Sequence, residues 1–177
     1  PKLILSSFGH FGVQIFIFLS GYGLAKSFAS MPTQRTISFT LKHIYKVYFL
    51  LFVGLCFLLI GRYIGLSKIS TSTLLEFGFK RASLLSNFSM DTLFELAGPW
   101  WFIGFIVQMY LLFPWLFKLL KRFGGKALFG ILLVSYVILL STGPLVGEIK
   151  FPMYGNFIGH LPEFSFGIFM AIYPQTK

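Results

Sequence analysis

The chain has 177 residues, of which 56% are hydrophobic, 20% aromatic and 11% charged, with 15 Lys and Arg against 5 Asp and Glu. A soluble domain carries about 25% charged residues. The composition therefore excludes a disordered chain, a fibre and a disulfide scaffold, and nearly excludes a soluble globular domain. A polytopic membrane protein is the class that fits.

Charge-free intervals mark the expected membrane spans. In chain order they are Leu3–Ala25, Val47–Gly61, Leu96–Phe117, Ala127–Gly147 and Phe151–Thr176. A helix needs about 20 residues to cross a hydrocarbon core of ~30 Å. The second interval is too short, but its helix reaches full length if it starts near Leu41 and if Lys46 and Arg62 extend to the interfaces. We therefore predict an all-α transmembrane helical bundle with about five spans, in a single membrane domain over residues 1–177.

The connections between the spans differ in charge. The first and third carry cations without an acid: Lys26, Arg35, Lys42 and Lys46 in one, and Lys118, Lys121, Arg122 and Lys126 in the other. The second and fourth mix cations with acids. Because Lys and Arg collect on the cytoplasmic side, the first and third connections are predicted to be cytoplasmic and the start of the chain external. This alternation favours a membrane protein over a nucleic-acid-binding surface.

The connection between the second and third spans is too long for a tight turn. Ser72, Thr73 and Glu76 resemble a helix start, and the apolar residues that follow have Lys80 and Arg81 among them. We predict an interfacial helix in this connection.

Polar side chains inside apolar spans are costly and are therefore candidates for function. His160 and Glu163 are three residues apart and share one helix face, where they can form a charge-assisted pair or a proton relay. A purely structural pair at a water-filled opening is an equally good interpretation. For Trp101 an aromatic belt is the simpler interpretation.

Other polar and small residues have simple structural interpretations. Gln108 is expected to bond a neighbouring helix, and Gly21 and Gly23 are expected to let helices approach closely. His10 is interpreted as structural and Cys56 as a small packed hydrophobe. With one cysteine in the chain, no metal cluster can be built on cysteine ligands.

A basic cluster lies at the predicted cytoplasmic end of the second span. Lys42, His43 and Lys46 have spacings of one and four residues, and together they can hold a phosphate-rich ligand from the cytosol. The alternative is that they only anchor the helix at the interface.

Four segments, in order along nearly the whole chain, resemble the integral-membrane acyltransferase-3 family. They are Gly12–Tyr22 (GVQIFIFLSGY), Lys42–Phe49 (KHIYKVYF), Trp101–Pro114 with its Trp-Phe-Ile and Tyr-Leu-Leu-Phe-Pro pieces, and His160–Phe164 (HLPEF), followed by Gly167. Relative to the family pattern, Gln14 stands where Asp is usual, and His43 and Lys46 stand where Arg is usual.

The resemblance implies a multi-pass O-acyltransferase of the bacterial inner membrane. Such an enzyme moves an acyl group, often acetyl, from cytoplasmic acyl-CoA to a hydroxyl of a cell-envelope polysaccharide. The resemblance places Lys42, His43 and Lys46 at the acyl-CoA entry and makes Trp101, His160 and Glu163 weak catalytic candidates in the core. Acyl-CoA is then a co-substrate, and no bound cofactor, metal or nucleic acid is expected.

The family's catalytic His lies on a helix before the first span, so we expect this chain to be a piece of a longer domain that is inactive alone. The alternative function is a transporter or flippase for a lipid-linked glycan, in which His160 and Glu163 couple to protons. A structural membrane subunit is a third interpretation.

Overall fold

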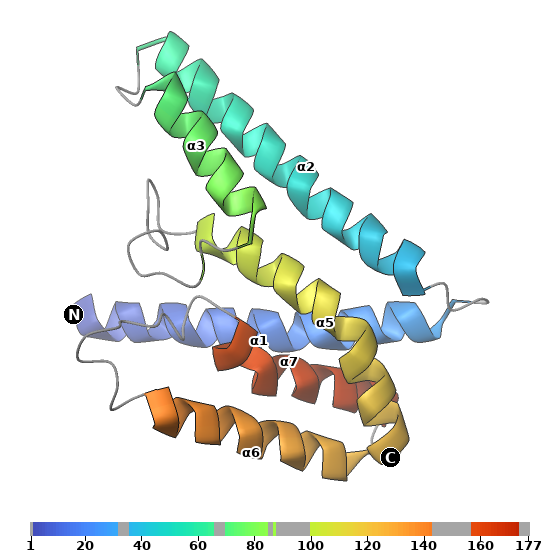
Figure 1. Ribbon diagram of the computed structural model, residues 1–177. Coiled ribbons are helices and arrows are strands. Elements are labelled where there is room, and N and C mark those ends of the chain that lie inside the picture. Colours follow the sequence, from blue (N-terminus) through green and yellow to red (C-terminus); the bar gives the residue numbers. More distant parts are fainter. Residues whose placement is uncertain are drawn as a thin grey trace. The chain divides into compact units, whose positions relative to one another are not determined.

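The computed structural model of the chain describes residues 2–31, 36–65, 70–84, 87, 100–142 and 157–173. Its helices in chain order are α1 (Lys2–Ala29), α2 (Thr36–Tyr63), α3 (Thr71–Ala82), α5 (Trp101–Phe123), α6 (Gly125–Thr142) and α7 (Phe157–Ile172), as Figure 1 shows. No strand occurs in the described ranges. The prediction of an all-α helical bundle is confirmed.

Three of the helices are long and apolar enough to cross a membrane: Phe11–Ala29 within α1, α2, and α5. α6 and α7 coincide with the fourth and fifth predicted spans and are apolar but shorter. The prediction of about five spans therefore corresponds to three helices of full length and two shorter ones among the described residues.

The predicted limits of the second span were wrong. α2 begins at Thr36 rather than near Leu41, and it runs through both Lys42 and Lys46. The segment Thr36–Leu41 contains no Gly or Pro that would end a helix, so the helix extends beyond the charge-free interval. A cation limits the buried length of a membrane helix without ending the helix itself.

The helix predicted in the long connection is present as α3, with a different cap. Ser70 is extended, and its Oγ accepts a hydrogen bond from the Thr73 backbone N–H at 3.1 Å. The expected start at Ser72 and Thr73 is therefore wrong by two to three residues. Glu76, expected in the cap, instead pairs with Lys80 across 2.8 Å.

The helices group into two compact units, each described by itself. The first unit comprises Pro1–Thr36, Leu112–Leu145 and Ile158–Lys177. It contains α1, the second half of α5, α6 and nearly all of α7. The second unit comprises Ile37–Leu111 and Val146–Phe157. It contains α2, α3 and the first half of α5.

Close backbone packing joins α1 and α7 in the first unit. A Cβ on Gly21 would collide with the backbone carbonyl of Phe164, and a Cβ on Gly167 would collide with that of Phe18. Two glycines, one on each helix, thus allow the helix backbones to touch. A Cβ on Gly23 would meet no atom within 4 Å, so the expected close approach holds for Gly21 and not for Gly23.

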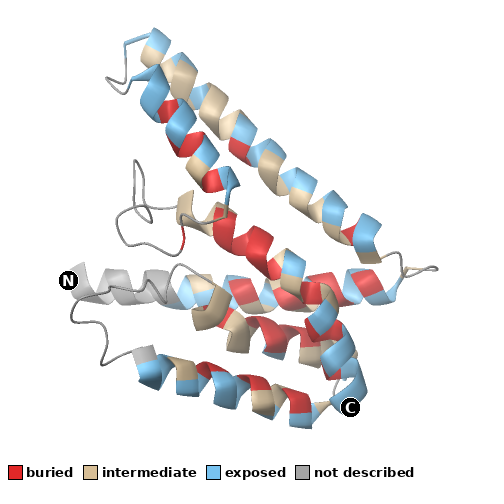
Figure 2. Cartoon of the chain, in the orientation of Figure 1, coloured by how far each residue is buried: buried red, intermediate tan, exposed pale blue. Residues whose placement is uncertain are grey.

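Aromatic rings of α1 and α5 and a narrow row of buried residues on α6 complete the core of the first unit. The Phe28 ring of α1 meets the rings of Phe113 and Phe117 of α5 edge-on, at 5.6 Å and 5.0 Å between centroids. In α6, burial recurs every fourth residue at Ala127, Ile131 and Ser135. Figure 2 shows buried and exposed stretches alternating along this helix. A single buried stripe on an otherwise exposed apolar helix is typical of a helix that faces lipid.

A single residue, Gly124, connects α5 and α6. Gly124 has a left-handed backbone with φ of 56°, and its N–H donates to the Leu120 carbonyl at 2.8 Å. The Tyr173 hydroxyl donates to the carbonyls of Leu120 and Lys121, at 3.5 Å and 3.3 Å. Because these carbonyls lack partners inside the helix, both contacts stabilise the end of α5.

In the second unit, α2 packs against both α3 and the start of α5. The Trp100 ring lies over Gly54 of α2 and meets Phe77 of α3 edge-on at 5.5 Å. Gly78 of α3 faces Leu55 of α2, where an added Cβ would come within 2.8 Å of the leucine side chain. Large residues on one helix thus fill gaps above glycines on the other.

Candidate functional site

The basic cluster Lys42–His43–Lys46 occupies one side of α2 near its start. Successive helix residues are rotated by about 100°, so residues 42, 43 and 46 lie within an arc of about 100°. Lys42 and Lys46 are exposed and His43 is half-buried. The three side chains therefore lie on one side of α2, and their role in binding a phosphate-rich ligand stays a prediction.

The His43 ring is held in a fixed orientation. Its Nδ1 lies 2.9 Å from the Phe39 carbonyl, and its ring packs on the rings of Phe39 at 4.3 Å and Tyr110 at 5.6 Å. Because a carbonyl oxygen can only accept, Nδ1 carries the hydrogen and Nε2 is the nitrogen left for a ligand. The cluster therefore offers two exposed ammonium groups, which suit a polyanion, beside one oriented imidazole ring.

Trp101 lies far from this cluster within the second unit. His43 of α2 contacts Tyr110 of α5, whereas Gly54 of α2 contacts Trp100, the residue just before α5, so the two helices run antiparallel. Trp100 lies ten residues before Tyr110, or about 15 Å along the axis of α5. The structure therefore does not bring Trp101 together with Lys42, His43 and Lys46.

The Trp101 ring contacts Phe102 and Phe105, with centroids at 5.8 Å and 5.9 Å, and it is half-buried. Its backbone carbonyl accepts a hydrogen bond from Asn87 Nδ2 at 2.7 Å. These contacts place Trp101 in an aromatic cluster at the start of α5.

His160 and Glu163 form the pair predicted on α7, in the first unit. His160 Nδ1 lies 3.9 Å from Glu163 Oε1, which is within ion-pair distance and beyond hydrogen-bond length. His160 is buried and Glu163 is half-buried. Glu163 Oε2 is itself buried and has no hydrogen-bond partner among the described residues. An acceptor left open in an apolar helix is costly, so this oxygen is suited to a further donor.

Gln108 connects three segments of the second unit. Its Nε2 donates to the Leu84 carbonyl at 3.0 Å, and its Oε1 accepts from the Phe157 backbone N–H at 3.3 Å. Leu84 has an unusual positive φ of 64°, and the bond from Gln108 holds its carbonyl in place. The prediction that Gln108 bonds a neighbouring helix is confirmed by its bond to Phe157, the first residue of α7.

The sequence analysis did not predict the burial of Asn87 and Arg81. Asn87 is fully buried and packs its Oδ1 against Gly104. Arg81 is also fully buried, with its guanidinium 5.1 Å from the centre of the Phe77 ring, although the sequence placed it on an interfacial helix. Asn87 stands outside every charge-free interval, so no pattern distinguished it from a loop residue.

Several predicted features lie outside the description. The side chain of His10 and the residue Arg35 are not among those that the structure describes. In the described part, no group of three His, Cys, Asp or Glu side chains is placed to hold a metal ion.

These helices and their length define an integral membrane protein. A family model described as an acyltransferase domain, that of the acyltransferase-3 family, matches residues 1–177. The match covers the whole chain, so the chain belongs to this family, as the sequence resemblance predicted. No curated protein and no solved structure gives a significant match.

Proposed function

We propose that this chain is part of an O-acyltransferase of the bacterial inner membrane that takes an acyl group, such as acetyl, from cytoplasmic acyl-CoA. The acceptor is a hydroxyl of a cell-surface carbohydrate. The observation that carries the proposal is the family match over residues 1–177. Membership of the family supports acyl transfer in general. The identity of the acyl donor, of the acceptor and of the bacterial inner membrane as the location belongs to the proposal.

The basic cluster supports acyl-CoA as the donor. CoA carries several phosphate charges, and Lys42, His43 and Lys46 present cationic and hydrogen-bonding groups on one surface of α2. The positive-inside rule assigns this end of α2 to the cytoplasm, where acyl-CoA is found. The Lys ammonium is a point charge and cannot form the paired hydrogen bonds of an Arg guanidinium, so phosphate binding here relies on charge more than on fixed geometry.

Transfer from a thioester to a hydroxyl requires a base for the hydroxyl proton and donors for the developing oxyanion. We assign Glu163 and His160 to the polar part of the acceptor path, because Glu163 Oε2 is a buried acceptor without a hydrogen-bond partner among the described residues. Trp101 is kept as a separate candidate in the second unit, because it belongs to the aromatic cluster at the start of α5. The base itself is expected to be the histidine that the resemblance places before α1.

The test is acetyl-CoA binding and release of free CoA thiol by the full-length protein in membrane vesicles. Lys46→Ala is expected to weaken acetyl-CoA binding about tenfold, because a hydrogen bond to a charged group contributes about 1.5–3 kcal/mol. Lys26→Ala is the matched control, because Lys26 is an exposed cation in the last turn of α1. Equal loss in both variants, or no loss in Lys46→Ala, would remove Lys46 from the donor site.

Release of thiol also separates the transferase from a transporter. A transporter or flippase for a lipid-linked glycan neither binds acyl-CoA nor releases CoA. Absence of thiol release with every carbohydrate acceptor, together with proton-dependent glycan movement that Glu163→Gln abolishes, would favour the transporter.

A further inference from the structure

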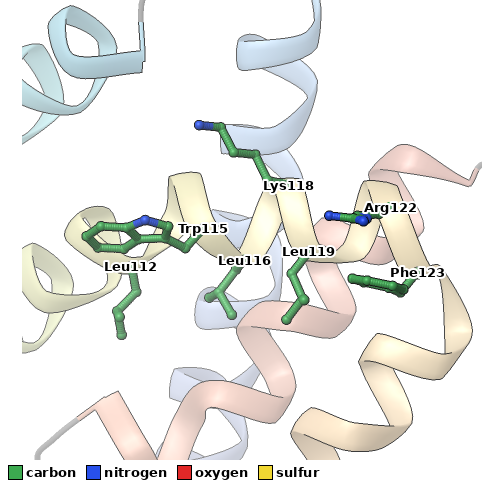
Figure 3. Close-up of a pocket in the computed structure, with 7 residues that line it drawn as sticks. All are labelled: Leu112, Trp115, Leu116, Lys118, Leu119, Arg122 and Phe123. Carbon is green, nitrogen blue, oxygen red and sulfur yellow. The ribbon is translucent and has the colours of Figure 1, made fainter.

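A shallow groove of about 360 Å³ lies along the second half of α5, within the first unit. All of its lining residues come from this one helix (Figure 3). Trp115, Leu119 and Phe123 follow one another at intervals of four residues and form one row, while Lys118 and Arg122 form the adjoining row. The groove is thus apolar along its length and cationic along one edge.

The apolar row is open. Trp115 is 69% exposed, and Leu119 and Phe123 are exposed as well. Figure 3 shows Leu112, Leu116 and Leu119 projecting from one side of the helix and Lys118 from the opposite edge. Large apolar side chains this exposed in a helix long enough to span a membrane are expected to contact lipid.

The two cations have no acidic partner in the described part of the chain. Neither Lys118 nor Arg122 takes part in an ion pair there, and both are exposed. The guanidinium of Arg122 lies 5.0 Å from the centre of the Phe123 ring, which directs it along the groove. The groove therefore presents two positive charges that need a counter-ion.

The groove has the length of one leaflet. It begins at Leu112, the middle residue of α5, and ends at Phe123, its last residue. Eleven residues of helix rise about 16 Å, which is half of a hydrocarbon core of ~30 Å. The cations lie toward the end that the sequence assigns to the cytoplasm. An amphiphile from that leaflet, with an anionic head and an apolar tail, matches both the length and the charge pattern.

We propose that this groove binds an anionic phospholipid of the cytoplasmic leaflet. The phosphate is held by Lys118 and Arg122, and an acyl chain lies along Trp115 and Leu119 toward Leu112. This inference goes beyond the proposed function, because the residues belong to α5 and the proposed acyl-CoA cluster belongs to α2. A second protein helix is a poorer occupant, because it would have to bury two cations without a matching acid.

The test uses the full-length protein in vesicles of phosphatidylcholine that contain brominated phosphatidylglycerol, with brominated phosphatidylcholine as the neutral comparison. Bromine on the acyl chain quenches tryptophan fluorescence on contact. We expect phosphatidylglycerol to quench at several-fold lower mole fraction than phosphatidylcholine. Trp115→Phe is expected to remove the component of quenching that depends on phosphatidylglycerol.

Charge variants assign the preference to the groove. Lys118→Gln with Arg122→Gln is expected to reduce the preference for phosphatidylglycerol about fivefold per cation removed. Lys121→Gln with Lys126→Gln is the matched control, because both lysines are exposed at the same end of the helices but do not line the groove. Lys118→Arg with Arg122→Lys is expected to retain the preference, which separates loss of charge from misfolding.

Four results would overturn the proposal. Equal quenching by the two brominated lipids would show no preference for an anion. An equal loss in the control double variant would assign the preference to the general surface charge. Competition of phosphatidylglycerol quenching by acetyl-CoA would assign the groove to the acyl donor, and quenching unaffected by Trp115→Phe would show that the groove is covered by protein.

Discussion

Gly21 of α1 lies directly against the backbone carbonyl of Phe164 of α7, with no room for a Cβ between them. The neighbouring residue on α7 is Glu163, so the contact holds the polar pair of α7 at a fixed position relative to α1. Two segments that are far apart in the sequence are thereby packed with their backbones in contact. This close packing explains why Gly21 and Gly167 occur in the family-like segments Gly12–Tyr22 and His160–Gly167.

Gly21→Ala is expected to destabilise the protein by about 1–3 kcal/mol, because overpacking forces rigid backbone apart. Gly23→Ala on the same helix is the control, because a Cβ there meets no atom within 4 Å. The control is expected to be neutral or slightly stabilising, since Ala favours helix over Gly by about 1 kcal/mol. Unfolding midpoints in detergent distinguish the two, and equal midpoints would contradict the close packing.

Gly124→Ala tests the turn between α5 and α6. An L-residue in the left-handed region costs about 1–2 kcal/mol, and Gly124 has φ of 56°. We therefore expect a lower unfolding midpoint for Gly124→Ala and no loss for Gly125→Ala, where an added Cβ meets nothing within 4 Å. A similar drop of the unfolding midpoint in both variants would show that the left-handed backbone of Gly124 is not the cause of the destabilisation.

Gln108 tests whether a polar residue inside a span is structural. Gln108→Leu is expected to destabilise by about 1–3 kcal/mol, because it leaves the Leu84 carbonyl and the Phe157 N–H without this partner. Gln108→Glu keeps an acceptor for Phe157 but places a buried carboxylate against the Leu84 carbonyl, so a loss at least as large is expected. Unchanged stability with lost acyl transfer would instead make Gln108 a substrate-binding residue.

The pair Glu76–Lys80 on α3 predicts a pH effect. The hydrogen bond and positive charge of Lys80 lower the pKa of Glu76 below its ordinary 4.5. Because the folded pKa is depressed, the pair stabilises α3 above pH 4.5 and loses this contribution as the pH falls through the folded pKa. NMR titration of the Glu76 carboxyl should show the shift, and Lys80→Ala should abolish it. An unshifted carboxyl in the parent protein would contradict the pair.

The helices could be predicted from the sequence because lipid imposes a simple length rule on apolar segments. The start of α2 could not be placed, because Lys42 and Lys46 interrupt the hydropathy pattern without interrupting the helix. The cap of α3 was misplaced because several consecutive Ser and Thr residues all favour an N-cap, and only the backbone conformation of Ser70 decides among them.

The candidate site was only partly predictable. The shared face of Lys42, His43 and Lys46 follows from spacing alone, and so does the proximity of His160 and Glu163. The separation of Trp101 from the basic cluster depends on the antiparallel packing of α2 against α5. This packing is a tertiary feature that no local sequence pattern predicts. Likewise, Gly21 and Gly23 look alike in the sequence, and only the neighbouring helix distinguishes them.

Because only Gly124 connects α5 and α6, the rotation of α6 about its own axis is fixed by the end of α5. Each residue inserted into that turn as helix would rotate α6 by about 100°. The buried stripe of Ala127, Ile131 and Ser135 would then turn into the lipid, and exposed residues would replace it. The number of residues in this turn is therefore constrained, because the turn length decides which face of α6 is buried.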